Sequence, residues 1–304
     1  MRVVSLIASS TEIVHALGAG NLLVARSHEC DYPPRAKTLP SITKPKFTPD
    51  GSSYQIDERI KAIVQEGLSV YSVDADRLSE LHPDVVITQM QCEVCAVSER
   101  DVHDALSAWS GDRPQIVSLR PDSLADVWKD IEKVAQALGR EAEGALLIES
   151  MRRRMAAVVE SMQSIHARPT VACIEWIDPL MAAGNWMPEL VEMAGGINVF
   201  GEAGKHSPAL AWDDLRRADP DVLFVSPCGF DVPTTLLEMS TLASRPGWND
   251  LRAVRSCRVA IADGNQYFHR PGPRLVESLE ILAHILHPEA THPGGNAGWV
   301  PWRG

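Results

Sequence analysis

Short apolar runs alternate with amphipathic stretches along this chain. Five runs in the first 120 residues have the length and β-branched content of strands, and turn residues and then apolar positions at helical spacing follow each of them. These runs are RVVSLI, LLVAR, LSVYSV, DVVIT and QIVSL. A second series, TVACIEW, INVFG, DVLFVS and CRVAIA, begins after residue 169. The alternation predicts an α/β protein whose sheets are mainly parallel.

The section between the two series has helical periodicity only. SLADVWKDIEKVAQALG and GALLIESMRRRMAAVVESMQSI place apolar residues every three to four positions and contain no proline. We therefore predict two similar Rossmann-like lobes, residues 1–120 and 169–290, joined by a long helical connector over 121–168. The tail, 291–304, has glycine, tryptophan and proline without periodicity, and we expect it to be disordered or to lie across a neighbouring molecule.

The two series also resemble each other in sequence. Residues 12–21 and 189–198 share a glutamate, a glycine and an asparagine at a constant offset of 177 (189 minus 12). Residues 78–87 and 215–224 share a leucine and a Pro-Asp pair at an offset of 137 (215 minus 78). Because the order of the two matches is the same in both series, we predict that the lobes have a common topology.

The loops after the strands are the candidate binding segments, because ligands of open α/β sheets bind outside the carboxyl ends of the strands. If the lobes face each other, these loops line one ligand cleft between them. The loops are residues 8–11, 27–32 and 89–95 in the first series, and 175–178, 226–230 and 263–270 in the second.

Charge narrows the range of partners. The chain has 29 Lys and Arg residues against 40 Asp and Glu residues, and its formal charge of -11 repels nucleic acid and anionic membrane surfaces. The first residues, MRVVSLIASSTE, hold only a short apolar run, which predicts neither a signal peptide nor membrane insertion. We expect a monomer that is cytoplasmic as written, or periplasmic or at the cell surface if a leader was removed.

Several segments together resemble a known family. RVVSLIASSTEIVHALGAG, SHECDYPP, LHPDVVI, AAGNWMPELVEMAGGINVF and NQYFHRPGPRLVESL are similar to segments of the class III substrate-binding proteins of ABC importers, and most similar to those of the cobalamin-binding subgroup. The resemblance runs from Arg2 to about His287. It implies two α/β lobes joined by a rigid helix, cobalamin or a related corrinoid as the ligand, and an ABC transporter permease as a partner.

The resemblance also implies residue roles. It places Tyr32, Trp186, Tyr267 and Phe268 in loops that face the corrin ring, and Arg274 near the ligand. Trp176 joins them, because large flat aromatic faces bury much area on a planar macrocycle. His28 and His269 are the candidate histidines. Each could serve as a neutral axial ligand of cobalt, or be an ordinary loop histidine. The candidate ligand-binding residues are Ser9, Ser10, His28, Tyr32, Trp176, Trp186, Tyr267, Phe268, His269 and Arg274.

Two carboxylates are candidates for docking to the importer. The family has docking carboxylates at the start of the helix that precedes each Pro-Asp strand. Here Asp76 and Asp213 each lie seven residues before the proline, Pro83 or Pro220. That symmetric placement suits two arginine pockets on a two-fold transporter.

The cysteines support an alternative class of function. Cys92 and Cys95 form a Cys-x-x-Cys in TQMQCEVCAVS, and Cys30 and Cys228 also fall in predicted binding loops. Four thiolates can hold zinc or a [4Fe-4S] cluster, which would make the chain a cytoplasmic metalloprotein. A redox pair and plain packing residues are the other interpretations of Cys92 and Cys95. No Gly-x-Ser-x-Gly or Walker-type motif is present, so we do not expect an enzyme.

Overall fold

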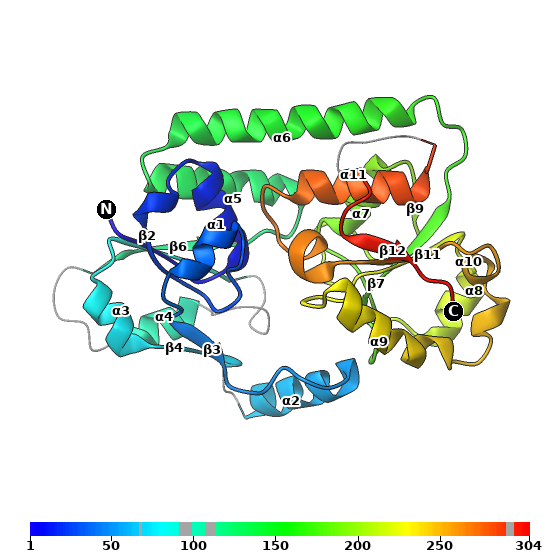
Figure 1. Cartoon of the computed structure of the whole chain (residues 1–304), viewed down its shortest axis with the longest axis horizontal. Coiled ribbons are helices and arrows are strands. Elements are labelled where there is room, and N and C mark those ends of the chain that lie inside the picture. The colour runs from blue at the N-terminus through cyan, green and yellow to red at the C-terminus, as the bar shows by residue number, and fades with distance from the viewer. Residues whose placement is uncertain (67–68, 91–98, 107–112, 290–294) are drawn as a thin grey trace. The chain divides into compact units, whose positions relative to one another are not determined.

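The computed structural model describes residues 1–66, 69–90, 99–106, 113–289 and 295–304 (Figure 1). The chain forms two compact units, each of which is described by itself. Unit 1 comprises Met1–Gly51, Gln55–Pro121 and Ala125–Ser150, and unit 2 comprises Ser52–Tyr54, Asp122–Leu124 and Met151–Gly304.

Unit 1 is built on a four-stranded parallel sheet with the order β2-β1-β5-β6. Its strands are β1 (Val3–Ser5), β2 (Leu23–Arg26), β5 (Val85–Gln89) and β6 (Gln115–Leu119). Its helices are α1 (Ala8–Ala16), α2 (Ser53–Gln65), α3 (Ala75–Leu81), α4 (Glu99–Ala105), α5 (Leu124–Ala137) and the first part of α6 (Glu141–Met162). Val4, Ala25 and Val86 of the sheet are fully buried and pack against Leu78 of α3 and Val102 of α4.

One predicted strand of unit 1 lies elsewhere than expected. The run LSVYSV contains β4 (Tyr71–Val73), which pairs antiparallel with β3 (Thr43–Pro45) in a separate two-stranded sheet. The other four runs of the first series form the parallel sheet, as predicted. The helical periodicity after residue 121 is also confirmed, since α5 and the 22-residue α6 occupy that section.

Unit 2 is built on a six-stranded, mainly parallel sheet with the order β12-β11-β10-β7-β8, and β9 also pairs with β7. Its strands are β7 (Thr170–Trp176), β8 (Met181–Ala182), β9 (Ile197–Asn198), β10 (Val222–Val225), β11 (Val259–Ala262) and β12 (Trp299–Pro301). Its helices are α7 (Met187–Met193), α8 (Trp212–Ala218), α9 (Val232–Ala243), α10 (Arg252–Arg255) and α11 (Leu275–Leu286), with the π-helical turn η4 (Gly264–Phe268).

Helices cover both faces of the unit 2 sheet. Figure 1 shows α7 and α11 on one side of it and α8, α9 and α10 on the other. Alternate residues of each strand point to opposite faces, so Ile174 and Val225 pack with Leu215 of α8 and Met239 of α9. The central residues of β7 and all residues of β10 are buried on both faces, which explains the continuous apolar runs seen in the sequence.

The predicted repeat is visible in the topology of the two units. In each, the first strand lies between the strand that follows α1 or α7 and the strand that follows Pro-Asp, so β2-β1-β5-β6 corresponds to β9-β7-β10-β11. The helices α1 and α7 also end alike, with Gly18 and Gly195 at φ of 71° and 79°. These positions require the left-handed conformation that glycine adopts without strain.

The shared Pro-Asp pair has a structural role in both units. Asp84 accepts a hydrogen bond from the backbone N–H of Arg2 at 2.6 Å, and Asp221 accepts one from the backbone N–H of Thr170 at 2.9 Å. Each aspartate therefore ties the start of one central strand to the start of its neighbour. The matching residues of the repeat are structural, and they lie at the amino ends of the strands.

The end of the chain joins the unit 2 sheet, contrary to our expectation for the tail. β12 pairs antiparallel with β11, with Val300 opposite Ile261. Trp302 packs edge-on against Trp248 at a centroid distance of 5.3 Å. Residues 299–302 are thus ordered against their own unit, because β11 offers a free edge and Trp248 an apolar face.

We expect Asp221→Asn to lower the free energy of unfolding by about 1–2 kcal/mol at pH 7. Burial alone would raise the pKa of Asp221, but hydrogen bonds from Thr170 and Arg252 outweigh it and lower the pKa to about 2. Since the pKa is lower in the folded state, this stabilisation is present above about pH 4 and is lost as the pH falls toward 2. Urea unfolding of both proteins at pH 7 and pH 3 measures it. Asp126→Asn, which removes a surface pair with Lys129, is the control; an equal effect of the two changes at pH 7 would refute this role.

Candidate ligand-binding site

A chain of polar contacts joins strand β7 to four loops at the carboxyl ends of the unit 2 strands, which we call the unit 2 edge. The hydroxyl of Ser207 donates to Oε2 of Glu175 at 2.7 Å and accepts from the backbone N–H of Gly184 at 3.1 Å. The same Oε2 lies 3.8 Å from Nδ1 of His269. Nε2 of His269 bonds to the carbonyl oxygen of Ser226 at 2.6 Å. The chain links the last residues of β7 to the segments that follow β8, β9, β10 and β11.

Three polar atoms at this edge have no partner among the described residues. Two lie at the strand ends: the indole Nε1 of Trp176, the last residue of β7, and the hydroxyl of Ser226, which directly follows β10. The third is Oδ1 of Asn185, in the loop after β8. Ser226 is only 1 % exposed. A buried polar atom without a hydrogen bond costs about 1–3 kcal/mol, and such exceptions call for an explanation. The ring of Trp176 also packs against Phe230 at a centroid distance of 5.2 Å. This edge therefore combines an aromatic surface with unsatisfied hydrogen-bonding groups.

Most of the other residues predicted in unit 2 are held within the protein. Trp186 is 4 % exposed, and its Nε1 donates to the carbonyl oxygen of Phe268, which is fully buried. Arg274 is also buried, with its guanidinium 5.3 Å from the ring centroid of Tyr267. Trp186 and Phe268 thus brace the loop that carries His269. Their direct contact with a ligand remains a prediction.

The serines predicted in unit 1 do not lie in a loop. Ser9 and Ser10 are buried in the first turn of α1, because the helix begins directly after Ile7. The hydroxyl of Ser10 lies 2.6 Å from that of Ser5, and Oγ1 of Thr11 lies 2.7 Å from the Ser5 hydroxyl and 3.0 Å from Sγ of Cys30. These hydroxyls and the thiol form a buried network at the end of β1.

His28 and Tyr32 occupy the loop after β2. His28 bonds through Nδ1 to the hydroxyl of Thr43 at 2.7 Å, and its ring lies 5.4 Å from that of Tyr71. Burial first, and then the charge of Arg26, lower the pKa of His28, so its imidazole is neutral at pH 7. Tyr32 is 43 % exposed. The roles of both residues in ligand binding remain predictions.

The cysteine hypothesis finds no support in the described residues. Cys30 is fully buried, Cys228 is half-buried, and the described part of the chain contains no cluster of three His, Cys, Asp or Glu side chains suited to a metal ion. Cys92 and Cys95 lie outside the described residues, so the structure says nothing of a site that includes them.

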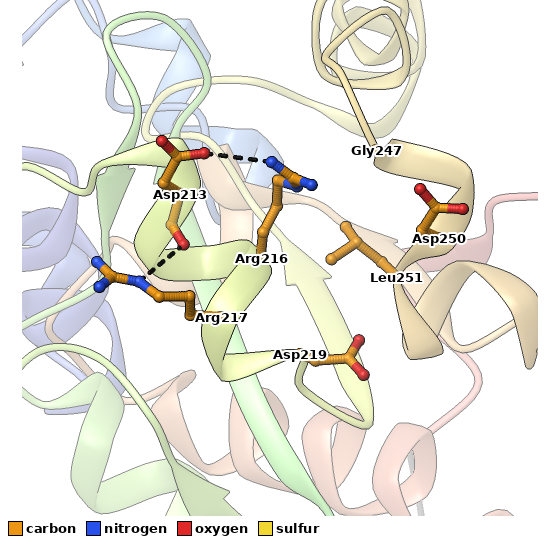
Figure 2. Close-up of a pocket in the computed structure, with 7 residues that line it drawn as sticks. All are labelled: Asp213, Arg216, Arg217, Asp219, Gly247, Asp250 and Leu251. Carbon is orange, nitrogen blue, oxygen red and sulfur yellow. Dashed lines mark hydrogen bonds and ion pairs between the residues drawn. The ribbon is translucent and has the colours of Figure 1, made fainter.

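The two candidate docking carboxylates are exposed. Asp76 lies in the first turn of α3, and Asp213 in the first turn of α8. The side chain of Asp213 is 80 % exposed and lies 3.3 Å from that of Arg216. It borders a hollow of about 600 Å³ on unit 2 (Figure 2). The hollow is lined by Asp213, Arg216, Arg217, Asp219, Gly247, Asp250 and Leu251.

Sequence reasoning placed Glu175 and Ser226 in candidate loops but gave them no role at the site, and it missed Ser207 altogether. The position of Glu175 and Ser226 after buried strands was the available signal. Ser207 lies in the segment KHSPALAW, which has neither a motif nor a periodicity. Only the fold shows that this segment returns beside β7 and β8.

The fold and this edge define a class of protein. Two units of common topology, each with a parallel sheet and polar and aromatic groups at the carboxyl ends of its strands, are typical of proteins that bind small molecules rather than macromolecules. The family model described as "Periplasmic binding protein" matches residues 3–265. The chain therefore belongs to the periplasmic binding protein family, and is a substrate-binding protein of the class III type.

Individual relatives agree with this assignment. An uncharacterized ABC transporter substrate-binding lipoprotein, YvrC of Bacillus subtilis, is 23% identical over 95% of this chain and 80% of its own length. The vitamin B12-binding protein of Photorhabdus laumondii is 21% identical over 94% of this chain and 88% of its own. The solved structure of the periplasmic heme-binding protein RhuT from Roseiflexus sp. RS-1 is 26% identical, with a TM-score of 0.70, over 95% and 98% of the two chains.

These names bear on two further expectations. They describe binding proteins and not enzymes, and they give no support to a cytoplasmic location. In the described residues, no helix combines the length and the apolar character that crossing a membrane requires.

We expect thiol reagents to separate the buried from the exposed cysteines. Burial, and then the charge of Glu175, raise the pKa of Cys173 to about 12, so almost none of it is thiolate at pH 8. Cys257 is exposed and has no such barrier. In a protein with Cys92→Ser and Cys95→Ser, iodoacetamide should therefore modify Cys257 within minutes and Cys173 only after unfolding. Mass spectrometry measures the extent of modification at each cysteine. Equal rates for these two thiols in the folded protein would contradict the buried placement of β7.

Proposed function

We propose that this protein binds cobalamin or a related corrinoid and delivers it to an ABC transporter permease. The observation that carries the proposal is the pair of unpartnered groups at the unit 2 edge, Nε1 of Trp176 and Oγ of Ser226. An indole N–H requires an acceptor, and a serine hydroxyl can donate or accept. The amide side chains of a corrinoid supply both kinds of partner, and the corrin ring supplies a flat apolar face for Trp176 and Phe230.

The charge at this edge supports an amide-bearing ligand over an anionic one. The carboxylate of Glu175 is 18 % exposed and lies one residue before Trp176. A carboxylate repels other carboxylates in a partly buried environment, and it accepts hydrogen bonds from neutral amides. The family and the vitamin B12-binding relative agree with a corrinoid.

Haem is the second candidate, and one observation favours it. His28 has a neutral imidazole whose Nδ1 is held by Thr43, which is the arrangement of a histidine that can ligate a metal through its other nitrogen. The likeness to a heme-binding structure agrees with this reading. Haem carries two propionates, and these would have to avoid Glu175.

The proposed location follows from the family rather than from the fold. We place the protein on the outer side of the cytoplasmic membrane, where an importer receives its ligand, and we propose that it acts as a monomer without catalysis. The predicted ligand cleft between the lobes and the predicted lobe boundaries are part of this proposal.

We expect Trp176→Phe to weaken cyanocobalamin binding by roughly five- to thirty-fold, because the ring face is retained while one hydrogen bond, worth about 1–2 kcal/mol, is lost. Absorbance titration with cyanocobalamin, and separately with haemin, measures the affinity for each. Trp299→Phe is the matched control. The Nε1 of Trp299 donates to the carbonyl oxygen of Gly295, and Trp299 lies in β12, an outer strand of the sheet that β11 and β10 separate from β7. Cyanocobalamin affinity that is undetectable in the wild type would refute the corrinoid proposal; tight haemin binding in its place would favour haem.

We expect charge reversal of both docking carboxylates, Asp76→Lys with Asp213→Lys, to reduce uptake of labelled cyanocobalamin at least tenfold in cells that contain the cognate importer. Two exposed carboxylates are well placed to meet basic side chains of a partner. Affinity for cyanocobalamin in solution should stay within twofold of wild type. Glu143→Lys, at an exposed carboxylate of α6, is the control. Normal uptake by the double variant would exclude these two residues as the docking contacts.

A further inference from the structure

We infer that Glu175 is a positioning residue that holds the unit 2 edge in its binding conformation, so that Trp176 and Ser226 meet the ligand already oriented. This inference rests on the proposed function and deepens it. Glu175 is the central member of the polar chain, since its Oε2 takes the Ser207 hydroxyl at 2.7 Å and lies 3.8 Å from Nδ1 of His269.

The contacts of His269 connect Glu175 to the loop after β10. Nε2 of His269 lies 2.6 Å from the carbonyl oxygen of Ser226. A carbonyl oxygen only accepts, so Nε2 carries a proton and donates it. Nδ1 lies on the side of Glu175, 3.8 Å from its Oε2, and the hydrogen bond to Ser226 sets the orientation of the ring. His269 is only 7 % exposed, so few other orientations are open to it.

The backbone of the same loops is closely packed at two points. A Cβ on Gly184 would lie 2.4 Å from the carbonyl oxygen of Lys205, and one on Gly264 would lie 2.1 Å from that of Pro227. Both glycines therefore mark points where two loops touch backbone to backbone. The Ser207 hydroxyl bonds to the Gly184 N–H at one of these points. The polar chain and the two close approaches act on the same loops.

The position of Glu175 in β7 makes its fixation relevant to the ligand. Glu175 and Trp176 are consecutive, so a tether on the first fixes the backbone from which the second projects. Ser226 is fixed in turn, because its N–H donates to Ile174 and its carbonyl accepts from His269. Both unpartnered groups thus leave from backbone that the polar chain holds. Neither group takes part in the chain itself, and neither has a hydrogen-bond partner among the described residues.

Preorganisation predicts a particular kinetic signature. When only a fraction of the free protein has the binding arrangement, the apparent affinity is the intrinsic affinity multiplied by that fraction. The reduction appears as a slower association. In stopped-flow binding of cyanocobalamin, we expect Glu175→Gln to lower the association rate constant about tenfold and to leave the dissociation rate constant within about twofold. Glu192→Gln, at an exposed carboxylate of the same unit that pairs with Arg168, should change neither.

A second measurement needs no ligand. In ¹⁵N-labelled protein, we expect the indole N–H resonance of Trp176, assigned with Trp176→Phe, to broaden or split in Glu175→Gln. That of Trp186 should stay sharp, because its N–H is held by Phe268.

The outcomes separate the two proposals. Wild-type association and dissociation rate constants in Glu175→Gln overturn the positioning role, and so does a faster dissociation alone, which would indicate a direct contact. If the wild type binds neither cyanocobalamin nor haemin, the proposed function fails, and the resonance of Trp176 then decides the positioning role. A single sharp resonance of wild-type position in Glu175→Gln overturns it.

Discussion

Parallel pairing of β7 with β10, and of β10 with β11, is the constraint on which the rest of unit 2 depends. It brings the carboxyl ends of three strands to one edge, and every loop that leaves those strands must begin there. The central residues of these strands are buried on both faces, so they cannot take part in recognition. The edge is the place where strand residues can combine a rigid backbone with an available side chain. Glu175, Trp176 and Ser226 all occupy that place.

The two units share a topology but use their edges differently. In unit 1, α1 begins three residues after β1, and the hydroxyls and thiol at that point bond to one another in a buried network. In unit 2, β7 extends to Trp176, and β8 is inserted before α7. The insertion brings Gly184 to the edge, where the separate segment between β9 and α8 brings Ser207. The two units therefore share a framework, while loops that only unit 2 has at this point form the polar chain.

The sequence predicted the framework better than the edge. Apolar runs found the strands, because buried strands are apolar throughout, and the shared Pro-Asp pairs marked equivalent positions. The resemblance to the importer proteins is confirmed at the level of the family. Three particular expectations went wrong: β4 lies outside the main sheet, Ala8–Thr11 is helix rather than loop, and residues 299–301 of the predicted tail form β12. In each case the outcome was set by a tertiary partner that a local pattern does not contain.

Side-chain roles were the least predictable, for the same reason. Trp186 and Phe268 stood out as large aromatic residues in candidate loops, yet both are buried and joined to each other by a hydrogen bond. Trp176 stood out for the same reason, and its indole nitrogen has no partner among the described residues. The sequence does not distinguish the two tryptophans. Whether a carbonyl oxygen lies opposite an indole nitrogen depends on how distant segments pack, since Trp186 and its partner Phe268 are about 80 residues apart.

Unsatisfied buried groups persist at this edge only if the loops that carry them are rigid. Each costs about 1–3 kcal/mol in the free protein, and a mobile loop would escape that cost by turning the group toward water or a nearby carbonyl. Trp176 and Ser226 do not escape it, because β7 is anchored through Glu175 and the loop after β10 through His269. The same bonds that stabilise the edge therefore keep two of its groups without partners. A ligand that satisfies those groups recovers the cost on binding, without spending free energy on ordering the loops.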